Sequence, residues 1–223
     1  MDSLVSTDWL ARHLGEPDLT MVDASWHMPK SGRSGREEHL VAHIPGARFL
    51  DIDAVRDTEH PVPHMLPSAK AFGEAVEQLG VGSHDRIVVY DNSPLRTAAR
   101  GWFMLRHFGA DQVAILNGGF QKWLAEGRPT ESGESGQREA RFEARENRSE
   151  VATKQELLGG MREPLLDARG KGRFEGSELD PRPGVAPGHV PGARNLPFSA
   201  LYNGDGTFKS PGEIRRLFAE AGI

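Results

Sequence analysis

Short apolar runs alternate with segments whose apolar residues recur at helical spacing through the first 126 residues. The run from Arg86 to Asp91 is the clearest strand, because its β-branched residues are continuous, as in a strand buried on both faces. Strands are predicted for residues 19–23, 48–53, 86–91 and 112–116, and helices for residues 7–14, 68–79, 97–108 and 120–126. This order predicts the α/β class, with a parallel sheet covered by helices on both sides.

A six-residue motif occurs twice in the chain. His-Ile-Pro-Gly-Ala-Arg at residues 43–48 returns as His-Val-Pro-Gly-Ala-Arg at residues 189–194, and each copy follows an apolar run that ends in Asp. Such self-similarity predicts a duplicated domain. We expect a first domain at residues 1–129, a polar, charged linker at residues 130–149 and the front part of a second domain at residues 150–223. Since the first copy continues much further past its motif, we expect the second domain to be incomplete at its C-terminus.

Composition removes several classes of function. The 223 residues carry 27 Lys and Arg against 32 Asp and Glu, a net charge of −5, so nucleic acid is not an expected partner. The N-terminus lacks the pattern of a signal peptide and no apolar stretch is long enough to cross a bilayer, which predicts a soluble cytoplasmic protein without a membrane partner. The sequence has no cysteine, which excludes disulfides, thiolate metal sites and thiol nucleophiles within these residues.

The loop after the clearest strand is the first place to look for chemistry. Ligands of an open parallel sheet bind beyond the carboxyl ends of its strands. There, the loop from Asp91 to Arg96 offers a carboxylate, an amide and a hydroxyl, but no strong nucleophile and no glycine-rich phosphate cradle. The corresponding loop of the second domain is not among the 223 residues.

Two further pairs of residues are candidates for a site. Arg173 and Arg182 lie in stretches rich in Gly and Pro, and two guanidinium groups on a rigid loop suit a small carboxylate or oxyanion. Spacing alone favours ordinary surface arginines. Asp53 closes a predicted strand and His64 lies in a proline-flanked turn. An acid that orients an imidazole is a common arrangement for a base, although ordinary strand-end and turn roles are commoner.

One pair of histidines has the spacing of metal ligands on a helix. His39 and His43 are four residues apart beside carboxylates, a spacing that on one helix would face one metal ion. However, His43 begins the repeated motif, and its counterpart His189 has no histidine four residues earlier. We therefore expect no metal site and no cofactor.

Short segments in order along nearly the whole chain carry a family resemblance. They lie at residues 23–29, 43–47, 51–53, 64–67, 89–91 and 117–123 in the first half, and at residues 166–169, 172–176, 181–184, 188–193 and 195–198 in the second. Together they resemble the tandem-domain rhodanese family, the 3-mercaptopyruvate and thiosulfate sulfurtransferases. The resemblance implies two rhodanese-like domains, each a parallel sheet flanked by helices, of which the second is incomplete in this chain.

The resemblance also implies a mechanism. In the family a cysteine of the second domain takes sulfur from 3-mercaptopyruvate or thiosulfate as a persulfide and passes it to a thiol, to thioredoxin or to cyanide. Arg173 and Arg182 would hold the donor's carboxylate and carbonyl. Asp53 and His64 would handle protons from the first domain, together with a serine of the absent loop. Asp91 stands where the cysteine would be in the first domain, which marks that domain as non-catalytic.

The departure from the family pattern leaves alternatives open. The cysteine-containing loop is absent, so this polypeptide alone cannot form a persulfide. We expect the missing C-terminal fragment to be a partner of the chain. The alternatives are a catalytically dead, truncated relative that binds small anions or acts as a scaffold, and a phosphatase, which would also need a cysteine. The choice between thiosulfate and mercaptopyruvate, the physiological acceptor and the oligomeric state stay open.

Overall fold

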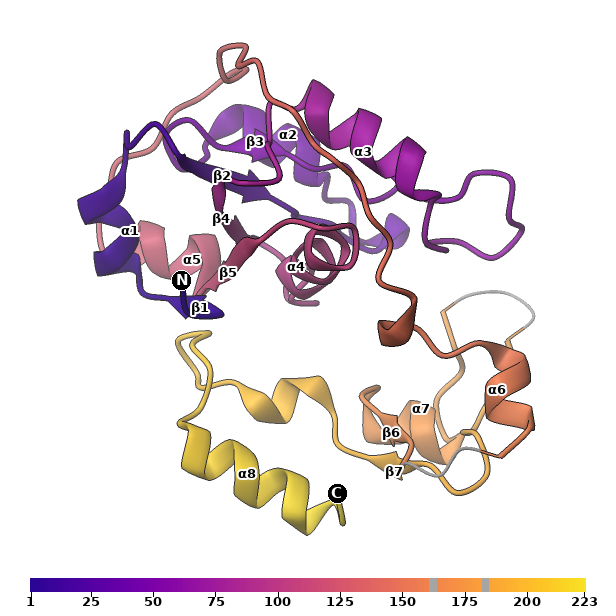
Figure 1. The fold of residues 1–223 in the computed structure, drawn as a ribbon. Helices are drawn as coiled ribbons and strands as arrows, with labels where there is room; N and C mark the ends of the chain where they lie inside the picture. Colours follow the sequence, from indigo (N-terminus) through magenta and orange to yellow (C-terminus); the bar gives the residue numbers. More distant parts are fainter. Residues whose placement is uncertain (161–163, 182–184) are drawn as a thin grey trace. The chain divides into compact units, whose positions relative to one another are not determined.

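The computed structural model describes residues 1–160, 164–181 and 185–223. They form two compact units, the first from Met1 to Glu150 and the second from Val151 to Ile223 (Figure 1). Each unit contains parallel strands joined through helical segments. This is the predicted α/β class.

The first unit is built on a five-stranded parallel sheet. The strand order is β1-β5-β4-β2-β3, with β1 at Leu4–Val5, β2 at Leu19–Asp23, β3 at Arg48–Phe49, β4 at Arg86–Tyr90 and β5 at Gln112–Leu116. β4 lies in the centre and pairs with β2 on one side and β5 on the other (Figure 1). The strands predicted for 19–23, 86–91 and 112–116 are thereby confirmed to within one residue.

β3 is much shorter than the sequence predicts. A strand is predicted over residues 48–53, but pairing with β2 ends at Phe49. The backbone then turns, because the Asp51 side chain accepts hydrogen bonds from the N–H groups of Asp53 (2.9 Å) and Ala54 (3.1 Å). Such local bonds compete with the ladder of a sheet. The turn carries Asp53 out of the sheet to an exposed position.

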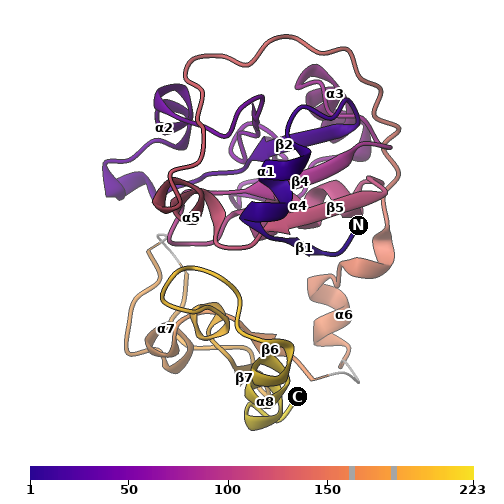
Figure 2. The ribbon, with the colours of Figure 1, turned by 90° about the vertical axis from the view of Figure 1, so that its left-hand side faces the viewer.

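Helices cover both faces of this sheet. They are α1 (Thr7–His13), α2 (Gly35–Val41), α3 (Ala69–Gln78), α4 (Ala98–His107) and α5 (Gly119–Ala125), with a 3-10 turn η1 at Pro29–Ser31. α1 and α5 lie on one face, and α3 and α4 lie on the other (Figure 2). Successive residues of β4 alternate between the two cores, so that Val88 packs with α1 and α5, and Val89 packs with α3 and α4.

Residues 130–149, which the sequence predicts to be a linker, belong to the first unit. We call this segment the strap; it runs over the unit and ends in the 3-10 turn η2 (Arg148–Glu150) (Figure 2). Glu131 forms a backbone bridge with His43, and Phe142 is buried edge-on against Phe72. The sequence does not predict these two contacts, because the segment is polar and a single aromatic side chain produces no periodic pattern.

Arg138 is the main polar anchor of the strap. Its guanidinium donates to both oxygens of Asp85, whose buried carboxylate also accepts from Gly82 N (2.8 Å) and Thr20 Oγ1 (3.0 Å). Burial opposes ionisation of Asp85, but these hydrogen bonds, with Arg138 first among them, hold its pKa below the usual value. The charged pair therefore ties the strap to the start of β4.

Replacing Arg138 by Met is expected to lower the free energy of unfolding by about 2 kcal/mol at neutral pH, because Asp85 stays buried without its counter-charge. The depressed pKa of Asp85 contributes stability that is present above the unfolded value of 3.8 and is lost as the pH falls through the folded value. The effect of Arg138→Met should therefore shrink in acid. Urea unfolding at two pH values measures this, with the surface residue Arg141→Met as the control. An equal loss for Arg141→Met would contradict the anchor.

The second unit contains two parallel strands and short helices. The helices are α6 (Lys154–Leu158), α7 (Lys171–Glu175), the 3-10 turn η3 (Phe198–Leu201) and α8 (Pro211–Glu220), and the strands are β6 (Leu166–Asp167) and β7 (Arg194–Asn195). Leu166 pairs with Arg194 as Val22 pairs with Arg48 in the first unit. The repeated motif thus leads into the same strand register twice.

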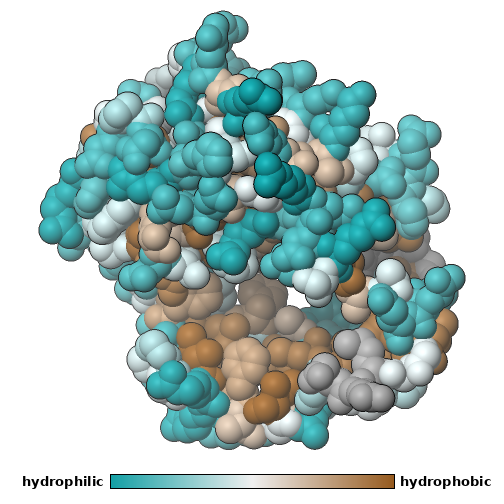
Figure 3. Space-filling view, viewed as in Figure 1, coloured by the Kyte–Doolittle hydropathy of each residue, from teal (hydrophilic) through white to brown (hydrophobic). Residues whose placement is uncertain are grey.

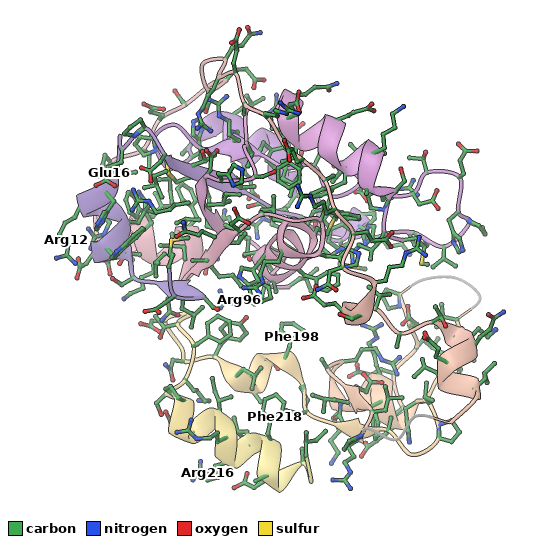
Figure 4. The ribbon with its side chains drawn as sticks, in the orientation of Figure 1. Arg12, Glu16, Arg96, Phe198, Arg216 and Phe218 are labelled. Atoms are coloured by element: carbon green, nitrogen blue, oxygen red, sulfur yellow. The ribbon has the colours of Figure 1, made fainter. Side chains whose placement is uncertain are left out.

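The described part of the second unit has a thin core. Leu196 is its only buried hydrophobic side chain, and β6 pairs there with β7 alone. The space-filling view shows apolar surface over this unit, whereas the visible face of the first unit is mostly hydrophilic (Figure 3). Phe218 lies on the side of α8 that faces η3, with Arg216 pointing away, yet Leu217 and Phe218 are only half-buried (Figure 4). Much of the apolar surface therefore lacks a cover among the described residues.

Candidate active site

Asp53 and His64 are brought together in the first unit. His64 Nε2 lies 2.8 Å from Asp53 Oδ1, and the other oxygen of Asp53 accepts a hydrogen bond of 2.7 Å from the indole N–H of Trp26. The Trp26 and His64 rings meet edge-on, with centroids 4.9 Å apart. With the proton on Nε2, His64 keeps Nδ1 as a proton acceptor. This is the geometry of an imidazole oriented by a carboxylate.

The pair remains accessible from solution. The Asp53 side chain is 56% exposed and the His64 side chain is 32% exposed. Both oxygens of Asp53 are nevertheless occupied by donors, which fixes the carboxylate. Trp26 is the member of this group that sequence reasoning missed. Its only signal is a large aromatic residue placed directly after the strand-end segment Asp23-Ala24-Ser25, outside any helical or strand periodicity.

In the loop that follows β4, backbone N–H groups that could bind a ligand instead bind the carboxylate of Asp91. Asp91 is buried, and its two oxygens accept from the N–H groups of Ser93 (2.8 Å) and Ala98 (2.7 Å). Burial raises the pKa of Asp91 to about 6, against the opposing effect of these two N–H groups. Since the N–H groups of Ser93 and of Ala98, the first residue of α4, donate to Asp91, these two groups are not available to an external anion.

Asp91→Asn is expected to change how stability depends on pH. A raised pKa means that Asp91 stabilises the fold most below its unfolded value of 3.8, and that this contribution is lost as the pH rises through about 6. Relative to the wild type, Asp91→Asn should therefore gain about 2 kcal/mol between about pH 4 and pH 7. Urea unfolding of both proteins at each pH measures the difference. A difference that is independent of pH would show that burial does not disfavour the ionised form of Asp91.

His39 and His43 are core residues of the first unit. Both are buried and their rings are stacked with centroids 4.1 Å apart. His39 Nδ1 lies 2.9 Å from Asp23 Oδ2, and His43 Nδ1 lies 2.7 Å from the carbonyl oxygen of His39. Within residues 1–160, 164–181 and 185–223, no group of three or more His, Asp or Glu residues is arranged to hold a metal ion. In the same ranges no helix is both long and apolar enough for a membrane span.

Arg173 lies on α7 in the second unit and already has a carboxylate partner. It donates to Asp180, whose side chain is 2% exposed, while the Arg173 side chain is 28% exposed. Its Nε is buried without a hydrogen-bond partner among the described residues. The guanidinium is thus oriented by Asp180 and retains donor capacity. Arg182 lies outside the described residues, so its predicted role is untested.

Arg169 is an arginine of the second unit whose hydrogen bonds serve the fold, in contrast to Arg173. Its guanidinium donates to both oxygens of Asp167 and to the carbonyl oxygen of Gly188 (2.7 Å). The bonds to Asp167 lower the pKa of its carboxyl group, and the bond to Gly188 ties the end of β6 to the residue just before the second copy of the repeated motif. Arg169 therefore has fewer donors left for a ligand than Arg173.

Comparisons with known proteins agree with the sequence motifs. The rhodanese-like domain family matches residues 6–126. The chain is 43% identical to 3-mercaptopyruvate sulfurtransferase from Rattus norvegicus, over 98% of this chain and 76% of that protein. This chain belongs to the rhodanese family. The predicted family resemblance is thereby confirmed.

The rhodanese chain is similar to both classes of sulfurtransferase. It is 41% identical to thiosulfate sulfurtransferase from Bos taurus, over 97% of this chain and 76% of that protein. A crystal structure described as a 3-mercaptopyruvate sulfotransferase from Escherichia coli superposes with a TM-score of 0.91 at 35% identity, covering 100% of this chain and 85% of that one. The predicted rhodanese fold is confirmed by this likeness, which extends over both units.

Proposed function

We propose that this chain is the part of a sulfurtransferase that binds an anionic sulfur donor and supplies proton-handling groups. The sulfur itself is carried as a persulfide by a cysteine outside these 223 residues, because they contain none. The observation that carries the proposal is the similarity to 3-mercaptopyruvate sulfurtransferase over 98% of the chain. The hydrogen-bonded Asp53–His64 pair supports it, since proton transfer needs an oriented imidazole.

We favour 3-mercaptopyruvate over thiosulfate as the donor. The carboxylate of 3-mercaptopyruvate suits the N–H groups that Arg173 does not use for its bond to Asp180. A second guanidinium at Arg182 would suit the neighbouring carbonyl. When the thiolate takes the sulfur atom, the carbon–sulfur bond breaks with its electron pair on carbon, and that carbon takes a proton to give pyruvate. In this scheme His64, held by Asp53, handles that proton together with a serine of the cysteine loop.

The proposal extends to the partners of the chain. The segment that bears the cysteine would cover the half-buried apolar side of α8 and pair with β6, whose only neighbour among the described residues is β7. The sulfur would then pass to a thiol acceptor such as thioredoxin, or to cyanide. We expect these reactions in the cytoplasm and without a metal or cofactor.

A second candidate is a protein without chemistry. The absence of cysteine from all 223 residues favours it, because such a relative would keep the Arg173 site and bind small anions or act as a scaffold. It differs from the first candidate in one respect that can be measured. Completing the chain would give it no sulfur-transfer activity.

A chimera tests the proposal. Residues 1–223 are joined to the segment of the rat sulfurtransferase that follows the matched region, and pyruvate release from 3-mercaptopyruvate is measured with a thiol acceptor. We expect turnover from the chimera, none from residues 1–223 alone, and none when the cysteine of the added segment is replaced by serine. A chimera that unfolds cooperatively but releases no pyruvate would favour the protein without chemistry.

A further inference from the structure

Arg100 of α4 is a half-buried cation that contacts the backbone of His64. Its terminal nitrogen donates a hydrogen bond of 2.7 Å to the His64 carbonyl oxygen. Among the described residues no carboxylate pairs with Arg100, and its Nε is buried without a hydrogen-bond partner. Burial alone lowers the pKa of this guanidinium. A buried N–H without a hydrogen-bond partner, on a cation without a carboxylate partner, destabilises a fold, so Arg100 is not explained by stability.

The backbone of His64 needs an external restraint. Its φ is +62°, a left-handed conformation that costs a residue with a side chain free energy. The surrounding residues 57–67 contain no helix or strand, and the bond from Asp57 N to Met65 O closes the segment as a loop. The bond from Arg100 is therefore a tether from a rigid helix to the residue that must be held.

The first turn of α4 also holds the other partner of Asp53. Thr97 Oγ1 donates to Ala24 O (2.7 Å) and accepts from the N–H of Trp26 (3.2 Å). Thr97 and Arg100 are three residues apart, a spacing that places them on the same side of the helix. One helical turn thus holds the backbone of both residues whose side chains donate to Asp53.

We propose that Arg100 is a positioning residue that holds His64 by its carbonyl oxygen and so directs the imidazole at Asp53. Thr97 performs the same task for Trp26. The importance of Arg100 for catalysis rests on the proposed sulfurtransferase function. Its effect on the orientation of His64 does not, because that orientation exists in the chain without any cysteine.

The test compares Arg100→Met with Arg106→Met in the 223-residue chain. Arg106 lies on the same helix, where it is exposed and stacked over Trp102. Thermal unfolding reports stability, and ¹⁵N chemical shifts of the His64 ring at about pH 8 report its tautomer. We expect Arg100→Met to keep its Tm within about 2 °C of the wild type, since it loses one hydrogen bond but also an unpaired buried N–H. Its His64 should nevertheless lose the single Nε2–H tautomer and the nuclear Overhauser contact to Trp26.

Two further variants sharpen the test. Arg100→Lys keeps a donor and should restore part of the Nε2–H tautomer, and Arg106→Met should leave His64 unchanged. In the chimera, Arg100→Met should lower kcat by about tenfold with little change in KM, because a proton-handling group is displaced while donor binding is retained. An unchanged His64 tautomer in Arg100→Met, whatever its Tm, would overturn the proposal. An inactive parent chimera would count against the sulfurtransferase function alone, because the His64 measurements do not depend on turnover.

Discussion

In the chimera, Arg173→Ala is expected to lower kcat/KM for 3-mercaptopyruvate by about two orders of magnitude, or about 3 kcal/mol. The guanidinium of Arg173 is oriented by Asp180 and retains a buried Nε–H without a partner among the described residues. The carboxylate of the sulfur donor would accept charged hydrogen bonds from Arg173 that no other group of α7 offers in this geometry. Initial rates at several concentrations of 3-mercaptopyruvate measure the effect.

Removing Arg173 also leaves Asp180 buried without this partner, so stability must be controlled. The double variant Arg173→Ala, Asp180→Asn removes that charge and should show the same loss of kcat/KM with a higher Tm than Arg173→Ala. Lys171→Ala on the same helix is the surface control, since Lys171 pairs with Glu175 and its side chain is 76% exposed. Unchanged kinetics in the double variant would remove Arg173 from the site.

Phe72→Ala is expected to lower the free energy of unfolding by about 4 kcal/mol. The ring is fully buried, stacked on Phe108 at 4.5 Å between centroids and edge-on to Phe142 at 5.9 Å. It therefore joins α3, α4 and the strap in one aromatic cluster. Urea unfolding followed by tryptophan fluorescence measures the loss.

The control for Phe72→Ala is Leu124→Ala on α5, because Leu124 is 46% exposed. Its loss should stay below about 1 kcal/mol. In Phe72→Ala, Phe142 of the strap loses the ring on which it packs, so its amide hydrogen should exchange faster than in the wild type. Exchange at Phe142 that matches the wild type would contradict the close packing of the strap against α3.

The sequence predicts the sheet well where strands are buried on both faces. β4 is recognised because its β-branched residues are continuous, and the repeated motif predicts the equivalent pairings of Arg48 and Arg194. β1 is missed because two residues give no pattern. Polar composition leads the sequence to predict a linker for the strap, and it does not reveal that Arg138 and Phe142 each contact a buried partner.

The site is less accessible to sequence reasoning because its contacts are not periodic. Asp53 and His64 are joined through a turn made by Asp51 and a left-handed residue, neither of which spacing predicts. Family resemblance selected both residues, and the structure adds the hydrogen bond between them. The ion pair of Arg173 with Asp180 could be anticipated only from their nearness in sequence. The predicted catalytic and substrate-binding roles themselves stay predictions.

The most direct test asks where the sulfur resides. The chimera and the 223-residue chain are each incubated with 3-mercaptopyruvate without an acceptor, and intact-protein mass spectrometry with peptide mapping follows. We predict that the chimera gains one sulfur atom at the cysteine of the added segment, that a thiol removes it, and that residues 1–223 gain none. A folded chimera whose mass is unchanged after incubation with the donor would contradict the account.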